Sequence, residues 1–417
     1  MSNILELLEG VEVEWKALGE VGELVRGNGL PKSDFTESGV PAIHYGQIYT
    51  YYGLSTTSTK SFVSSESAKK LRKVDKGDVV ITNTSENHED VGKAMVYLGE
   101  QQAVTGGHAT IFKPSKVILG KYFVYFTQTS VFTNEKRKYA KGTKVIDVSA
   151  TNMAKIQIPI PHLDIQGEIV RILDNFTELT AELTAELTAR KKQYHYYRDQ
   201  LILNSGAKSE KLKDISKIYL GLTYTPTYVE KGIKFISAQN TSSNVLNLTN
   251  VKYISEDEYE KSTSNAKPKR GDVLFTRVGS NLGHPVIVDT DEPLCMFVSL
   301  GFIRVNPKKV LSSYIKHWMN TDLFWDQVSK KTYGAAKINL NTGWLNEFDV
   351  LLPSIAEQAR IVAILDKFEA LTNSITEGLP REIELRRQQY EYYRDLLLSF
   401  PKPAAETPLE SVGKQHG

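Results

Sequence analysis

The 417-residue chain contains one cysteine, Cys295, and has no long apolar run. A single cysteine excludes an intramolecular disulfide and a zinc site built from several thiolates, and it fits a reducing compartment such as the cytoplasm. Because no stretch of about 18 apolar residues is present, no membrane-spanning helix is expected. The first residues, MSNILELLEG, are acidic rather than basic, which is unlike a secretory signal peptide.

The chain also lacks the motifs with which many enzymes hold phosphates, dinucleotides or metal ions. It contains neither a G-x-x-x-x-G-K-[ST] loop nor a G-x-G-x-x-G run, and its histidines do not have the spacing of metal ligands. Lys and Arg total 51 against 49 Asp and Glu, so any surface that binds nucleic acid must be local. We therefore expect no catalysis by this chain, and no cofactor or metal bound to it.

What the sequence does contain is a long internal repeat. The segment near residue 160 reads PIPHLDIQGEIVRILDNFTEL, and the segment near residue 352 reads LPSIAEQARIVAILDKFEAL. Gln166 and Asp174 have counterparts 192 residues later (358 − 166), at Gln358 and Asp366. This period is far longer than the 20 to 50 residues of solenoid repeats. It therefore predicts two half-chains, each a globular block followed by a long helix.

Apolar residues in both helical segments recur at alternating steps of three and four, which is typical of a coiled-coil seam. Since each seam needs a partner, we expect the helix over 163–203 to pack antiparallel on the helix over 354–399. The predicted fold class is α+β, with two similar globular domains, two long antiparallel coiled-coil helices and pseudo-two-fold symmetry. The expected blocks are 1–157, 158–205 (central helix), 206–350, 351–400 (C-terminal helix) and 401–417 (flexible tail).

Local signals refine these elements. Ser354 followed by Glu357 is a capping-box pattern, and Asp164 is the expected cap of the first helix. Gly378 and Pro380 are expected to kink the second helix. Short runs rich in β-branched and aromatic residues predict strands within 43–54, 77–84 and 93–98. The first helix alone carries the sequence TELTAELTAEL, whose four-residue unit is close to one helical turn.

The order of these pieces resembles the specificity subunit of type I restriction–modification systems. Each globular block ends in a basic stretch that begins with glycine, at Gly142-Thr-Lys144 and Gly334-Ala-Ala-Lys337. A proline-containing strand, a helix with Gln and Asp eight residues apart, and a Tyr-Tyr-Arg-Asp helix end then follow in both halves. The TAEL repeat resembles the type IC subgroup. The chain departs from the family at Ile165-Gln166-Gly167-Glu168, where Glu-Gln is usual.

The resemblance implies that each block is a target-recognition domain that reads half of an asymmetric, bipartite duplex DNA site. It implies that the helices set the gap between the half-sites. Two modification subunits would dock on the chain and carry S-adenosylmethionine to methylate adenine. Restriction subunits would add ATP- and Mg-dependent translocation and cleavage. The expected subunit-interface residues are Gln166, Asp174, Tyr196, Tyr197, Arg198, Gln358, Asp366, Tyr392, Tyr393 and Arg394.

Reading DNA requires hydrogen-bonding side chains on loops and basic groups for phosphates. Polar loops follow the same predicted strand in both halves, at 82–88 and 276–281, and a basic run precedes each long helix. Arg277 is expected to contact a base and Lys331 a phosphate. A plain polar turn is the alternative explanation of either loop. The expected DNA-contacting residues are Gln47, Tyr51, Thr82, Asn83, Thr84, Ser85, Asn87, His88, His108, Lys138, Lys141, Lys144, Gln239, Asn240, Thr276, Arg277, Ser280, Asn281, Lys330, Lys331, Tyr333 and Lys337.

Two other functions remain open at this point. The chain is alternatively a non-catalytic helical scaffold whose globular blocks bind proteins or peptides, and salt-dependent binding to duplex DNA would separate this alternative from the first. A single-chain restriction and methylation enzyme would need a methyltransferase domain for which the two halves leave no room.

Overall fold

The structure of the chain is a computed structural model that describes residues 6–279, 281–332, 339–374 and 376–402. In these ranges, none of the helices combines the length and the apolar content needed to cross a membrane. The chain forms two compact units. Unit 1 comprises residues 1–181 and 385–417, and unit 2 comprises residues 182–384. The predicted blocks are divided differently, because each unit includes parts of both long helical segments.

The described part of unit 1 contains two five-stranded sheets and two short antiparallel strand pairs. The first sheet has, in spatial order, β2 (Gly22–Arg26), β12 (Ala109–Pro114), β8 (Val79–Thr82), β10 (Ala94–Tyr97) and β5 (Ser55–Thr56). The second has β3 (Phe35–Thr36), β6 (Ser61–Val63), β4 (Val40–Ile43), β11 (Ala103–Thr105) and β7 (Arg72–Val74). The pairs are β1 (Val13–Ala17) with β14 (Gln157–Pro161), and β9 (Thr84–Ser85) with β13 (Ile146–Asp147).

The main core of unit 1 forms where the first sheet packs against aromatic helices. Phe112 of β12 lies 4.9 Å from the ring of Phe123, and both side chains are fully buried. Strands β8 and β10 are buried at every position, which explains why they read as apolar runs. The helices of unit 1 before the long repeat are α2 (Tyr45–Thr50), α3 (Ser65–Lys70), α4 (Gly120–Phe126), α5 (Ser130–Tyr139) and α6 (Ala150–Met153), with short 3-10 turns at Leu18–Glu20 and Lys32–Asp34.

The strands predicted within 77–84 and 93–98 are confirmed as β8 and β10, but the run over 43–54 is mostly helical. Strand β4 ends at Ile43, and α2 begins directly afterwards. The reason is local: the His44 ring accepts a hydrogen bond from the Gly46 backbone N–H, and Gln47 accepts one from the His44 N–H. These capping bonds outweigh the strand preference of the aromatic residues.

Unit 2 repeats this architecture, with fewer strands in its described part. One sheet has β16 (Ser216–Leu220), β22 (Leu300–Val305), β19 (Val273–Thr276) and β20 (Pro285–Ile287), and the other has β18 (Lys252–Ile254), β17 (Ile233–Ile236) and β21 (Leu294–Met296). Strand β15 (Lys208–Lys211) pairs antiparallel with β23 (Asp349–Leu352). The helices of the block are α8 (Leu212–Ile215), α9 (Glu256–Lys261), α10 (Ser312–Trp318), α11 (Asp322–Thr332) and α12 (Thr342–Asn346), with 3-10 turns at Ala238–Thr241 and Ser264–Ala266.

The same strand neighbours recur in both units, which confirms that the two globular blocks share a fold. Strand β12 lies between β2 and β8, and β22 lies between β16 and β19. Strand β4 pairs parallel with β11, and β17 pairs parallel with β21. The polar loops at 82–88 and 276–281 therefore follow equivalent strands, β8 and β19.

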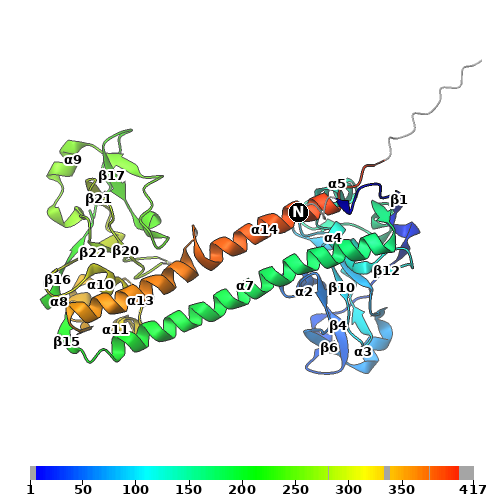
Figure 1. Cartoon of the computed structure of the whole chain (residues 1–417), viewed down its shortest axis with the longest axis horizontal. Helices are drawn as coiled ribbons and strands as arrows, with labels where there is room; N and C mark the ends of the chain where they lie inside the picture. Colours follow the sequence, from blue (N-terminus) through cyan, green and yellow to red (C-terminus); the bar gives the residue numbers. More distant parts are fainter. Residues whose placement is uncertain (1–5, 280, 333–338, 375, 403–417) are drawn as a thin grey trace, which may run out of the picture. The chain divides into compact units, whose positions relative to one another are not determined.

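The two long helical segments differ in continuity. Helix α7 (Leu163–Leu203) runs without a break for 41 residues (Figure 1). The second segment is divided into α13 (Ile355–Asn373) and α14 (Gly378–Leu397), so the expected kink is an interruption. Gly378 has a φ of +75°, and a Cβ there would lie 2.5 Å from the Ala370 carbonyl oxygen. Only glycine fits this backbone turn without strain.

The antiparallel pairing of the two segments is confirmed inside each unit. In unit 1, the ring of Phe176 in α7 stacks on Tyr393 near the end of α14, with centroids 5.3 Å apart. In unit 2, Phe368 in α13 stacks on Tyr197 near the end of α7, with centroids 6.1 Å apart. The start of one helix therefore lies beside the end of the other in both units.

Each helix also ends inside a globular core. Leu397 at the end of α14 and Leu398 directly after it belong to the core of unit 1, and Ile202 near the end of α7 belongs to the core of unit 2. All three side chains are at most 1% exposed. Apolar residues of the long helices therefore pack in the domain cores as well as between the two helices.

The helix starts are partly as expected. The Ser354 hydroxyl accepts a hydrogen bond from the Glu357 N–H, as a capping serine does, while the Glu357 carboxylate pairs with Arg360. The prediction that Asp164 caps α7 is wrong. Asp164 lies in the first helical turn, and its N–H donates to the ring of His162.

Candidate nucleic-acid interface

In unit 1 the predicted polar loop and the predicted basic stretch lie side by side. Strand β9 of the loop pairs with β13, so that Thr84 lies opposite Asp147 and Ser85 opposite Ile146. Lys141 and Lys144 precede this pairing on the connecting segment, and both are exposed. The structure therefore brings hydrogen-bonding side chains and free ammonium groups together at one edge, as a nucleic-acid surface requires.

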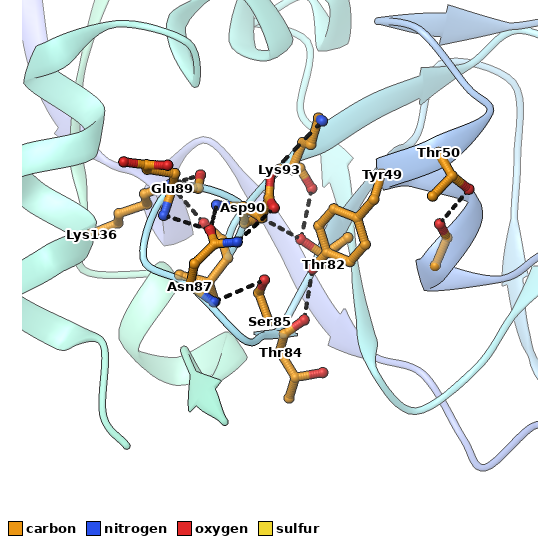
Figure 2. Close-up of polar contacts among 12 residues, drawn as sticks. Tyr49, Thr50, Thr82, Thr84, Ser85, Asn87, Glu89, Asp90, Lys93 and Lys136 are labelled. Atoms are coloured by element: carbon orange, nitrogen blue, oxygen red, sulfur yellow. Dashed lines mark hydrogen bonds and ion pairs between the residues drawn. The ribbon is translucent and has the colours of Figure 1, made fainter. Parts of the chain in front are cut away.

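The loop after β8 is held in shape by its own hydrogen bonds (Figure 2). The Asn87 side-chain oxygen accepts from the N–H groups of Glu89 and Asp90, and its amide group donates to the Asp90 carboxylate. Tyr49 of α2 donates its hydroxyl to the Thr84 carbonyl at 2.6 Å. Since the Asn87 side chain is bonded internally, it shapes the loop, while His88 stays exposed at the surface.

A buried lysine, Lys136, holds the same loop through hydrogen bonds to its backbone carbonyls. The ammonium of Lys136 in α5 donates to the carbonyl of Glu89 at 2.9 Å (Figure 2) and to that of Val91 at 2.6 Å. Burial lowers the pKa of Lys136 to about 8. Lys136 thus belongs to the basic run but holds the loop, whereas Lys138 pairs with Glu135 at the surface.

Exposed His108 belongs to an aromatic cluster that the sequence did not reveal, in which Tyr45 contacts His44, Tyr49 and His108. Its ring is 4.9 Å from Tyr45 of α2, and its Nδ1 is 3.1 Å from the Thr84 hydroxyl. Tyr45 and Tyr49 were not predicted as site residues, because the contact of Tyr45 with His108 depends on the parallel pairing of β4 with β11. No spacing along the chain signals that pairing. Tyr51, a predicted residue, is 59% exposed and lies beneath the Lys60 ammonium.

Two predicted base contacts in unit 1, Thr82 and Asn83, are wrong because their side chains are buried. Thr82 and Asn83 are fully buried. The Thr82 hydroxyl donates to backbone carbonyls, and the Asn83 oxygen accepts from Thr110. Gln47 donates to the Ser61 hydroxyl and caps α2. Thr82 and Asn83 therefore stabilise the fold beneath the surface, while Gln47 is only half-buried and its prediction stays untested.

The equivalent positions in unit 2 need the same correction. Arg277 is 9% exposed, and its guanidinium donates to the carbonyls of Leu340 and Val298 at 3.2 and 3.0 Å. Its planar group is therefore not presented as a fork for guanine. Thr276 is buried against Thr241, and Asn240 caps the turn at Ser237 while donating to Asn247.

The remaining predicted residues of unit 2 divide into two groups. Gln239, Asn281, Lys330 and Lys331 are exposed and stay candidates. The predictions for Ser280, Tyr333 and Lys337 lie outside the described residues.

Gln166 and Gln358 were expected at a subunit interface, but both are fully buried. The Gln166 side chain accepts from the Leu119 N–H and donates to the carbonyls of Val117 and Pro161, at 2.8–2.9 Å. The Gln358 side chain makes the same three bonds, to Leu311, Lys309 and Pro353. These glutamines fasten each long helix to its domain, which is the physical reason for their place in the repeat.

Asp174 and Asp366 occupy equivalent positions but have different partners. Asp174 binds the Lys121 ammonium at 2.7 Å and the Tyr125 hydroxyl at 2.6 Å, and its side chain is 22% exposed. Asp366 lies 2.8 Å from His317 Nε2 and is 55% exposed. The hydrogen bond with His317 holds the pKa of the Asp366 carboxyl below its usual value. Asp366 is thus the more available of the two.

His317, Asp366 and Glu369 form one group in the described part of the chain whose ligand atoms are close enough to hold a metal ion, within 4.8 Å of one another. The Lys316 ammonium, however, donates to both Glu369 carboxylate oxygens at 2.9 Å. An ammonium at that position repels a divalent cation, so the group fits a hydrogen-bond network better than a metal centre.

The Tyr-Tyr-Arg-Asp helix ends present one face and bury the other. Tyr196 and Tyr392 are 62% and 64% exposed. Arg198 is 2% exposed and pairs with Asp199, and Tyr393 is buried against Phe176, so neither forms the predicted interface surface directly. Tyr197 is 43% exposed and Arg394 is half-buried. Tyr196 also lines a surface pocket of about 380 Å³ together with Asp322 and Asp326.

A comparison with protein families matches residues 10–190 and 204–385 to a family described as the type I restriction modification DNA specificity domain. The chain is 35% identical to the type I restriction enzyme EcoR124I/EcoR124II specificity subunit of Escherichia coli, over 97% of this chain and 98% of that one. It is 30% identical to a putative type I restriction enzyme specificity subunit of Haemophilus influenzae, over 95% and 97%.

Solved structures show the same fold at low sequence identity. A chain from a type I R-M system structure aligns with a TM-score of 0.63 and 15% identity, covering 93% of this chain and 97% of that one. The type I S subunit from M. genitalium aligns with a TM-score of 0.55 and 13% identity, covering 96% and 99%. Two similar α+β blocks and long helices are therefore common to these proteins and this chain.

Proposed function

This chain belongs to the family of type I restriction–modification DNA specificity domains, and from that premise we propose that it reads an asymmetric, bipartite duplex DNA site and positions modification and restriction subunits on it. One observation carries the proposal: the same strand-end loop occurs in both units with different side chains. The loop presents half-buried Ser85 and exposed His88 in unit 1, and exposed Asn281 in unit 2. One fold that presents two chemistries suits a site with two unlike halves.

The DNA-contacting residues are proposed from exposure and position. In unit 1 we place base or sugar contacts at Thr84, Ser85, His88 and His108, with Tyr45 as an added member, and phosphate contacts at Lys141 and Lys144. In unit 2 we place them at Gln239, Asn281, Lys330 and Lys331. Tyr51 with Lys60 forms a further exposed contact in unit 1.

The chain itself is proposed to perform no chemistry. Two modification subunits would hold S-adenosylmethionine and flip adenine out of the duplex to methylate it. Restriction subunits would hold ATP and Mg²⁺. The exposed tyrosines of the two helix ends, Tyr196 and Tyr392, are the proposed docking contacts for the modification subunits. The assembly would act in the cytoplasm, where the DNA is.

Methylation mapping tests the function. Purified chain, modification subunit and S-adenosylmethionine are incubated with genomic DNA, and methylated adenines are located by sequencing. We expect a two-part motif only when both proteins are present. Methyl transfer by the chain without its partner would refute the non-catalytic role, and a chain that binds the subunit but never DNA would favour a scaffold.

The proposed phosphate contact of Lys331 can be tested separately. Lys331→Ala removes an exposed ammonium, so binding to all sequences should weaken alike, and the slope of log affinity against log salt should fall by about one charge. The exposed Lys261, which lies on α9, provides the control substitution Lys261→Ala, and its salt slope should match that of the original chain.

A further inference from the structure

Unit 2 contains a surface cavity of about 530 Å³. Its apolar wall includes Val245, Ile287 and Ala370, and its charged end is formed by Lys316, Asp366 and Glu369. Val245 is 62% exposed at the tip of the loop that follows the 3-10 turn Ala238–Thr241. The cavity thus combines an apolar wall with an acidic end.

The internal repeat shows what this position holds in unit 1. Helices α4 and α10 are equivalent, because Gln166 and Gln358 bind the residue before each of them in the same way. In that register Lys121 corresponds to Ser313, which lines the cavity. Lys121 places its ammonium 2.7 Å from Asp174. Serine is too short to do the same for Asp366, so the space of a lysine side chain is left open.

The charges at the acidic end do not cancel within unit 2. Lys316 and Glu369 form an ion pair in which each side chain is 15% exposed. Asp366 interacts with His317 through Oδ1, and within the described residues no hydrogen bond to its Oδ2 is found. One carboxylate therefore remains half exposed beside an apolar wall. This combination suits a cation on an aliphatic stem, and it repels the phosphates of DNA.

We propose that this cavity receives a lysine or arginine side chain of the modification subunit, whose cationic head pairs with Asp366 and whose stem packs on Val245, Ile287 and Ala370. This inference rests on the proposed function, because it names a contact of the partner that the function requires. In unit 1, Lys121 already occupies the corresponding position. The two ends of the chain therefore hold their partner subunits through different contacts.

The repeat supplies the decisive variant. Ser313→Lys places in unit 2 the residue that unit 1 carries, so it should fold, neutralise Asp366 internally and exclude the partner's side chain. Affinity of the full-length chain for purified modification subunit is measured by isothermal titration calorimetry. At one of the two sites we expect a loss on the order of 10-fold or more. Ser313→Ala adds neither charge nor bulk and should bind as the original chain does.

A second variant separates the effect of the Asp366 charge from the effect of filling the cavity volume. Asp366→Asn keeps the shape of the cavity and removes the charge, so it should weaken the same site, while Asp257→Asn on the exposed face of α9 should not. Normal binding by both Ser313→Lys and Asp366→Asn would overturn the inference and leave the proposed function intact. Failure of the original chain to bind the modification subunit would instead refute the function.

Cross-linking identifies the occupant directly. Cys295 is buried, so Val245→Cys creates an accessible thiol that can carry a photoreactive group. In the assembled complex, mass spectrometry should recover a modification-subunit peptide that contains Lys or Arg at the linked site. A peptide without a basic residue would overturn the assignment. So would saturable binding of Zn²⁺ that His317→Ala abolishes, since the occupant would then be a metal ion.

Discussion

Gln166 and Gln358 show why a polar residue recurs on an otherwise apolar helix face. Each side chain uses its oxygen and its amide hydrogens within a buried site, and each ties the first turns of a long helix to two segments of its domain. A buried amide with all partners in place is specific in a way that an apolar contact is not. The repeat is therefore explained by folding before any partner is considered.

Replacing either glutamine with alanine should destabilise the chain strongly. Gln166→Ala removes the hydrogen-bond partner of the buried Pro161 carbonyl and of the part-buried Leu119 N–H and Val117 carbonyl, and it opens a cavity. We expect a loss of about 2–4 kcal/mol in the free energy of unfolding, measured by urea denaturation. Glu178→Ala, at an exposed position of the same helix, is the control and should change stability by less than about 0.5 kcal/mol. Equal effects of the two changes would contradict the buried role.

Arg277 illustrates a residue whose role follows from its surroundings. As an arginine on a loop it favours a guanine contact, but the structure surrounds it with the carbonyls of Leu340 and Val298. Arg277→Ala is therefore expected to lower the free energy of unfolding by about 1–3 kcal/mol and to leave half-site preference unchanged. Lys330→Ala is the exposed control for stability. A relaxed base preference without a loss of stability would restore the base-contact role.

At the scale of residues, sequence patterns place a polar loop at the end of β8 but do not tell which of its side chains face outward. The loop after β8 was located correctly, yet Thr82 and Asn83 at its start are buried while Ser85 and His88 are not fully covered. The burial of Thr82 and Asn83 depends on the β9–β13 pairing and on contact with strand β12, whose Thr110 bonds to Asn83. Both are contacts between residues far apart in the chain, and one sequence contains no signal for them.

At the scale of elements, the two helical segments show how single glycines act in opposite ways. Gly167 lies in the first turns of α7, and a Cβ added there meets no atom within 4 Å. Gly378 has a positive φ and approaches the Ala370 and Leu371 carbonyls. The first glycine only adds flexibility to the unfolded chain, whereas the second makes the break between α13 and α14.

These two glycines give a matched pair of substitutions with opposite signs. Gly167→Ala should raise the free energy of unfolding by about 0.5–1 kcal/mol, because alanine favours the helix. Gly378→Ala should lower it by about 1–3 kcal/mol, because the backbone conformation and the nearby carbonyls exclude a side chain. Thermal denaturation of both variants provides the test. Stabilisation by Gly378→Ala would mean that the two helices can merge into one.

The elements themselves were predictable to different extents. The long helices, their antiparallel pairing and the buried strands β8 and β10 follow from apolar periodicity and from the repeat. Helix α2 does not, because its start depends on the His44 and Gln47 caps, which oppose the strand preference of its tyrosines. The second segment is interrupted between Asn373 and Gly378 rather than kinked as expected. Gly378 has a positive φ, which does not continue a right-handed helix.

At the scale of the whole molecule, the internal repeat carried more information than any local pattern. It indicates two domains of one fold, assigns one helix to each, and makes equivalent residues comparable across the halves. The same comparison distinguishes Lys121 from Ser313, which no search for motifs would separate. What the repeat does not provide is the bases of each half-site, since these depend on exposed loop residues that differ between the halves.

The TAEL segment of α7 allows a prediction about the spacing of the two half-sites. The division between unit 1 and unit 2 falls inside it, after Ala181. Its leucines Leu183 and Leu187 are only partly buried, and neither belongs to a domain core. Inserting one further TAEL after Leu187 therefore lengthens the helical connection by about 6 Å without disturbing either core.

The geometry of DNA decides how large the effect should be. Duplex DNA rises about 3.4 Å per base pair along each strand, so about 6 Å corresponds to one or two base pairs. Four residues rotate a helix by about 400°, an offset of about 40° from a full turn. One base pair rotates DNA by about 35°, at about 10 base pairs per turn. One added base pair fits the rotation better, and helix bending must absorb the remaining length. Methylation mapping of the insertion variant should show the same half-site bases separated by one more base pair, whereas an unchanged gap or altered bases would refute the role of this segment in spacing.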